Sequence, residues 1–128
     1  MVKQLYSLFE SKTYLLHTEL YQSLGVHETR FTSSRQLNKA IAHSSPDIIL
    51  AEFLYGFGNN YAGVNISNLD VSLYTLQRYA PRARIIIVAD KSELPHVSKL
   101  EELFHIDAVL KLPLTPSQLR LAINKLVE

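Results

Sequence analysis

Two short runs of apolar residues, neither interrupted by a polar residue, set the strongest limit on how this chain folds. They are residues 48–51 (IILA) and 85–88 (IIIV), and strands that are buried on both faces of a sheet have this composition. Between them, residues 67–80 carry leucines at helical spacing and stop before Pro81, which cannot continue a helix. A buried strand, a helix and a second buried strand in this order predict a parallel sheet covered by helices.

The same alternation of strand and helix repeats along the chain. Residues 26–32 are largely polar, which is typical of an edge strand. Five units without a glycine-rich phosphate loop predict an α/β fold: a flavodoxin-like, doubly wound sheet of five parallel strands in the order 2-1-3-4-5, with helices on both faces. Strands are expected at residues 2–9, 26–32, 48–51, 85–88 and 108–110, and helices at 11–24, from 33, at 67–80, from 92 and from 115.

Several helix boundaries carry their own signals. Gly25 is expected to stop the first helix. Ser33 with Gln36, and Thr115 with Gln118, have the spacing of a capping box, which satisfies free backbone N–H groups at the start of a helix. The fourth helix is expected to begin at Ser92 and to face inward with Leu94, Val97, Leu100 and Leu103.

Composition narrows the class of protein. The chain has 128 residues, of which 47% are hydrophobic, enough for one compact domain over residues 1–128 without disulfides or a structural metal. The absence of cysteine excludes thiol catalysis. A formal net charge of +1 makes nucleic acid an unfavourable partner for this domain alone. With no apolar run long enough for a membrane span and no signal peptide pattern, we expect a cytoplasmic protein without membrane contact.

The order of residues resembles the receiver domain of bacterial two-component response regulators over essentially the whole chain. Residues 46–52 (PDIILAE) resemble the strand that ends in the phospho-acceptor Asp, and residues 85–90 (IIIVAD) the strand that ends in a switch Thr or Ser. Residues 107–114 (DAVLKLPL) resemble the stretch that ends in Lys-Pro. The resemblance implies a site where an acidic pair and the acceptor Asp hold Mg²⁺, while a Lys and a hydroxyl bind the phosphoryl oxygens.

The reactive positions of that family are changed in this chain. Glu52 stands at the acceptor position, and its extra methylene displaces the carboxylate by about one bond length. The acidic pair is reduced to Glu10, and Ala89 offers no hydroxyl. Leu112 stands at the Lys position, and Lys111, one residue earlier, should point to the opposite face. The result is a degenerate phospho-acceptor pocket made of Glu10, Glu52, Ala89, Lys111, Leu112 and Pro113.

Two groups of residues leave alternatives open. Glu52 either imitates a phosphorylated Asp or is a strand-end carboxylate in a partly solvated pocket, and Glu10, Glu52 and Asp90 could gather around a divalent cation. The glycine-rich and aromatic segment 53–65 is long for a loop after a strand. Its aromatic residues either form a partner surface or a lid over a small ligand, or fold down as a local core. These possible loop contacts are Tyr55, Phe57 and Tyr61.

These observations predict a pseudo-receiver that acts without phosphorylation and is not an enzyme. It would need no cofactor or metal and would bind a protein partner, or form a homodimer, in signal transduction or transcriptional regulation. The fourth helix, last strand and fifth helix are the expected interface, and the charged residues there have both signs. The alternative is a small-ligand or cation sensor that uses the former phosphorylation pocket under the 53–65 loop. The last expected helix finishes at the end of the sequence, so an effector domain could follow Glu128.

Overall fold

The computed structural model describes residues 3–10, 18–55 and 67–127. Five parallel strands form one sheet in the order β2-β1-β3-β4-β5, which confirms the predicted fold class and strand order. The strands are β1 (Lys3–Leu8), β2 (Val26–Phe31), β3 (Ile48–Glu52), β4 (Arg84–Ala89) and β5 (Ala108–Lys111). The helices are α1 (Thr18–Ser23), α2 (Ser34–His43), α3 (Asp70–Tyr79), α4 (Leu94–Glu101) and α5 (Pro116–Val127).

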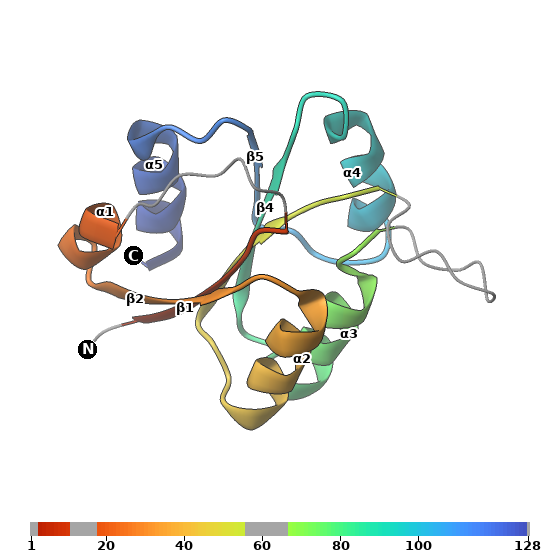
Figure 1. Cartoon of the computed structure of the whole chain (residues 1–128), viewed down its shortest axis with the longest axis horizontal. Coiled ribbons are helices and arrows are strands. Elements are labelled where there is room, and N and C mark those ends of the chain that lie inside the picture. Colours follow the sequence, from red (N-terminus) through yellow and green to blue (C-terminus); the bar gives the residue numbers. More distant parts are fainter. Residues whose placement is uncertain (1–2, 11–17, 56–66, 128) are drawn as a thin grey trace.

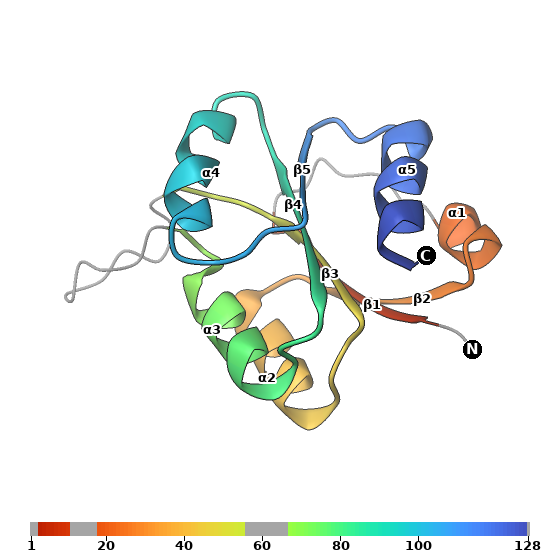
Figure 2. The same cartoon turned by 180° about the vertical axis from the view of Figure 1, so that it is seen from behind.

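Helices cover both faces of the sheet. Helices α1 and α5 lie together on one face, and α2, α3 and α4 lie on the other (Figure 1). Figure 2 shows the same two layers from behind, with β3 and β4 between them. Alternate residues of each central strand enter opposite cores. Ile49 of β3 joins the core under α2, α3 and α4, while its neighbours Ile48 and Leu50 join the core under α1 and α5.

The helix signals in the sequence were mostly correct. Gly25 follows α1 with a φ of 71°, the left-handed conformation that favours glycine. The Ser33 hydroxyl accepts a hydrogen bond from the Gln36 backbone amide at 3.2 Å. At the start of α5 both halves of a capping box form: the Thr115 hydroxyl accepts from the Gln118 amide at 3.2 Å, and the Gln118 side chain accepts from the Thr115 amide at 3.3 Å.

The predicted boundaries of two helices need correction. Helix α4 begins at Leu94, not at Ser92, because Ser92 lies in a turn in which the Leu94 amide donates to the Asp90 carbonyl at 3.0 Å. Since α4 ends at Glu101, Leu103 falls outside its helical period and is 53% exposed, and Phe104 is buried instead. Helix α3 begins at Asp70 rather than residue 67, and of the first expected helix residues 11–17 lie outside the described residues. No helix in the described part of the chain is long and apolar enough to cross a membrane.

Candidate functional site

The predicted pocket residues lie at one edge of the sheet, where the parallel strands end. Glu10 follows β1, Glu52 ends β3, Ala89 ends β4 and Lys111 ends β5. Because β1, β3, β4 and β5 are neighbours in that order, their carboxyl ends form a continuous edge. The register places Ala89 beside Lys111. Ligands of doubly wound sheets bind at this edge, so it is the candidate site.

Glu52 is a buried carboxylate bonded to the neighbouring strand end. Glu52 is 3% exposed, whereas one of the two alternatives for this residue placed it in a partly solvated pocket. The Glu52 Oε1 atom accepts a hydrogen bond from the Glu10 backbone amide at 2.9 Å. A buried carboxylate needs hydrogen-bond donors to offset the cost of removing it from water, and the Glu10 amide supplies one.

Asn68 completes this edge, a role that the sequence analysis did not predict. Its side-chain Nδ2 donates to the Glu10 Oε2 at 2.8 Å and to the Glu52 carbonyl oxygen at 2.9 Å. Its Oδ1 accepts from the Leu54 amide at 2.8 Å. One side chain in the segment before α3 therefore joins the end of β1 to the end of β3 and to Leu54 just after it. The only available signal was an asparagine near a helix start, which points to a local cap and not to a partner 58 residues away.

The segment that carries Asn68 is held by a buried hydrogen-bonded turn. The Asp70 Oδ1 accepts from both the amide and the hydroxyl of Ser67, each at 2.9 Å. The Ser67 hydroxyl in turn accepts from the Leu69 amide at 3.1 Å. Ser67 and Asp70 are each 2% exposed. This turn fixes the backbone of Asn68 and therefore the place where its amide lies.

The positions that should hold a hydroxyl and a cation carry apolar side chains. Ala89 is fully buried in the core under α2, α3 and α4. Leu112 packs against the opposite core, under α1 and α5, and precedes Pro113 through a cis peptide bond. Lys111 is exposed, as strand alternation predicts for the residue beside Leu112.

Asp90 does not join the other two carboxylates. Hydrogen bonds from the hydroxyl and then the backbone amide of Ser92 hold the pKa of the exposed Asp90 carboxyl below its ordinary value. No group of three acidic or histidine side chains that could hold a metal ion occurs in residues 3–10, 18–55 and 67–127. The structure therefore does not bear out the alternative in which Glu10, Glu52 and Asp90 gather around a divalent cation. The Mg²⁺ site that the fold family implies does not fit these residues, because the Glu10 carboxylate is already bonded to an amide.

Tyr55, which follows β3, packs against the surface of α4. Its ring stacks on the His96 ring, with centroids 3.8 Å apart and planes at 9°. The Lys99 ammonium donates to the Tyr55 hydroxyl at 2.8 Å, and the Glu93 carboxylate accepts from the Tyr55 amide at 3.2 Å. The chain after β3 is thus tied to the fourth helix. Phe57 and Tyr61, the other predicted loop contacts, lie outside the described residues.

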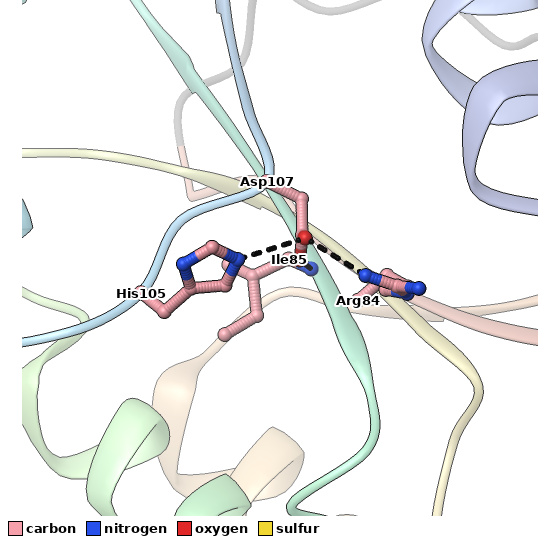
Figure 3. A network of polar contacts seen from close by, with 4 residues as sticks. All are labelled: Arg84, Ile85, His105 and Asp107. Carbon is pink, nitrogen blue, oxygen red and sulfur yellow. Dashed lines mark hydrogen bonds and ion pairs between the residues drawn. The ribbon is translucent and has the colours of Figure 1, made fainter.

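Carboxylates also lie at the opposite edge of the sheet, where the strands begin. The Asp107 Oδ2 accepts from the Ile85 amide at 2.7 Å, and its Oδ1 contacts Arg84 at 3.3 Å and His105 at 3.1 Å (Figure 3). The Asp107 side chain is 8% exposed. This network joins the start of β5 to the start of β4 and is remote from the candidate site.

Comparison with known proteins identifies the fold. No protein-family model and no curated protein matches the sequence. The structure is similar to a response regulator receiver domain protein from Clostridium thermocellum, with a TM-score of 0.73 and 17% identity over 98% of this chain and 94% of that one. It is also similar to the signal receiver domain of a putative LuxO repressor protein from Vibrio parahaemolyticus, with a TM-score of 0.74 and 13% identity over 99% and 91%. A response regulator solved as the RcsB–DNA complex has a TM-score of 0.68 and 14% identity, over 99% of this chain and 61% of that one. The chain has the fold of response regulator receiver domains.

Proposed function

We propose that residues 1–128 form a cytoplasmic pseudo-receiver domain, which acts in signal transduction or transcriptional regulation without aspartyl phosphorylation and by binding a protein. The observation that carries this proposal is the state of the Glu52 carboxylate. It is buried and accepts the Glu10 backbone amide, and Asn68 joins the same two strand ends. A carboxylate held in this way serves the fold and is poorly placed for attack on a phosphoryl group.

The surroundings of Glu52 also lack the groups that phosphoryl transfer needs. Transfer depends on an acceptor in line with the leaving group and on donors that stabilise the charge on the phosphoryl oxygens. Ala89 has no hydroxyl, and Leu112 packs into a core. Lys111, the residue before Leu112, is exposed. These features support a binding function over catalysis, and no observation in the described residues favours a small-ligand or cation sensor.

The test is treatment with a small phosphodonor. We expect the wild-type chain, incubated with acetyl phosphate and Mg²⁺, to keep its intact mass, and beryllofluoride to leave its melting temperature unchanged. Glu52→Asp should behave in the same way, because Ala89 and Leu112 still provide neither hydroxyl nor cation. A phosphorylatable receiver domain treated in parallel is the positive control. A stable phosphoryl adduct on the wild-type chain would falsify the proposal.

The surface of α4, β5 and α5 is the proposed binding face. Strand β5 is at an edge of the sheet, so within the described part of the chain its outer backbone groups have no neighbouring strand. Leu121 on α5 is 66% exposed and Val109 on β5 is 37% exposed. Leu121 borders a hollow of about 280 Å³ between β5 and α5. The exposed charges of this face have both signs and suit a second copy of the same chain: Glu101, Glu102, Lys111, Arg120 and Lys125.

Self-association tests this choice of partner. Sedimentation velocity over a range of concentrations should give a dimer for the wild-type chain and a monomer for Leu121→Glu, because a buried unpaired charge opposes association. Val71→Glu is the matched control, since Val71 is 52% exposed but lies on α3. Circular dichroism should be the same for all three proteins. If the wild-type chain stays monomeric throughout, the partner is a different protein, and homodimerisation is wrong.

A further inference from the structure

The amide of Asn68 lies between a carboxylate oxygen of Glu10 and the main-chain carbonyl oxygen of Glu52, at the ends of neighbouring strands. Two acceptor oxygens that face each other repel unless a donor, a proton or a cation lies between them. Here the group between them is the neutral Asn68 Nδ2, which donates to the Glu10 Oε2 at 2.8 Å and to the Glu52 carbonyl oxygen at 2.9 Å.

The oxygens around Asn68 Nδ2 are of the kinds that a divalent cation takes as ligands. They are a carboxylate oxygen of Glu10 and the main-chain carbonyl oxygen of Glu52. Their distances of 2.8 and 2.9 Å fit N–H donors and exceed the roughly 2.0–2.6 Å that Mg²⁺ and Ca²⁺ require. The amide nitrogen therefore makes the contacts at this point that a cation would otherwise make.

The other end of the amide makes a contact that a cation cannot make. Asn68 Oδ1 accepts from the Leu54 backbone amide at 2.8 Å, and that donor fixes which end of the side chain is oxygen. The side chain is 6% exposed, and the Ser67–Asp70 hydrogen bonds hold its backbone. A hydrogen-bonded turn thus holds Asn68 in a buried place, and its three side-chain contacts join its segment to Glu10 after β1 and to residues 52 and 54 at the end of β3.

We propose that the Asn68 side chain is a permanent internal substitute for a divalent cation. It fixes the ends of β1 and β3 to the start of α3 by neutral hydrogen bonds, so this edge of the sheet keeps one arrangement whether or not divalent cations are present. The inference rests on the proposed pseudo-receiver function and names what replaces the cation in it. Because the amide is part of the chain, it fills this position at every concentration of divalent cation, unlike a bound ion.

Asn68→Asp tests the proposal, because it keeps the shape of the side chain and exchanges a donor for a second carboxylate oxygen. Without divalent cations, repulsion from Glu10 should lower the melting temperature at neutral pH by on the order of 10 °C. Millimolar Mg²⁺ or Ca²⁺ should restore most of this loss, because the variant offers oxygen ligands around the same point. The wild-type chain should not respond. Asn124→Asp, at a half-buried position on α5, is the matched control and should not respond either.

A second measurement uses the wild-type chain alone, so the test does not depend on the stability of the variant. Mn²⁺ added to labelled wild-type protein should leave the Glu10 and Leu54 amide resonances sharp in the NMR spectrum. Selective broadening of these resonances would overturn the inference, as would an Asn68→Asp variant that no divalent cation stabilises or helps to refold. Broadening without a phosphoryl adduct would reject this inference and leave the proposed function standing. An adduct on the wild-type chain would reject the proposed function itself.

Discussion

The two edges of the sheet use carboxylates in the same way, although only one of them is the candidate site. At the edge where strands begin, Asp47 accepts from the Gln4 amide at 2.8 Å and Asp107 from the Ile85 amide at 2.7 Å. At the edge where strands end, Glu52 accepts from the Glu10 amide at 2.9 Å. In each case a carboxylate next to or at the end of one strand satisfies a backbone N–H at the corresponding end of its neighbour. A carboxylate at the site edge is therefore no evidence of chemistry by itself.

The largest stability effect should come from the edge where the strands begin. Asp107→Ala removes the acceptor of the Ile85 amide and the contacts with Arg84 and His105, and Asp107 is nearly buried. We expect a loss of about 2–3 kcal/mol in the free energy of unfolding. Asp47→Ala removes one bond at an exposed position and should cost only about 1 kcal/mol. Urea denaturation measures both losses. If they are equal, burial of the aspartate does not determine how much stability each substitution removes.

The smallest effect concerns Asp90, the exposed carboxylate of the site edge. The Ser92 hydroxyl and amide lower the pKa of Asp90 in the folded chain. A lowered folded pKa means that this contact stabilises the fold above the unfolded pKa and that its contribution is lost as the pH falls through the folded pKa.

Side-chain carboxyl NMR shifts should place the Asp90 midpoint below that of an unstructured peptide of the same local sequence. Ser92→Ala should move the midpoint upward and lower the melting temperature at neutral pH only slightly, because solvent screens the contacts of the fully exposed Asp90. An unchanged midpoint in this variant would show that the Ser92 contact does not cause the lowered pKa of Asp90.

Sequence patterns predicted the elements of the fold wherever the signal was local or periodic. The capping box of Thr115 and Gln118 needs only residues three apart, and both of its bonds form. The prediction for α4 was wrong because Ser92 has a competing local partner in Asp90, and a side chain that bonds within a turn does not cap the following helix. Leu103 was misassigned because a helical period was extended past the end of the helix.

The location of the site could be predicted from the sequence, but the hydrogen bonds within it could not. Glu10, Glu52, Ala89 and Leu112 were expected at the ends of adjacent strands, and the structure brings them to one edge. The role of Asn68 was not predictable, since its partners lie 14, 16 and 58 residues away. No spacing rule connects residues so far apart in sequence.

The sequence by itself determined the order of strands and helices, the burial of the central strands and the absence of a hydroxyl at Ala89 and a cation at Leu112. These follow from side-chain type and short periodicity, which depend on near neighbours in the chain. Only the tertiary structure decided that Glu52 is buried and that Asn68 joins Glu10 to it. Hydrogen bonds between distant segments exist only after the sheet has brought the strand ends together, so their partners depend on three-dimensional distance and not on spacing in the chain.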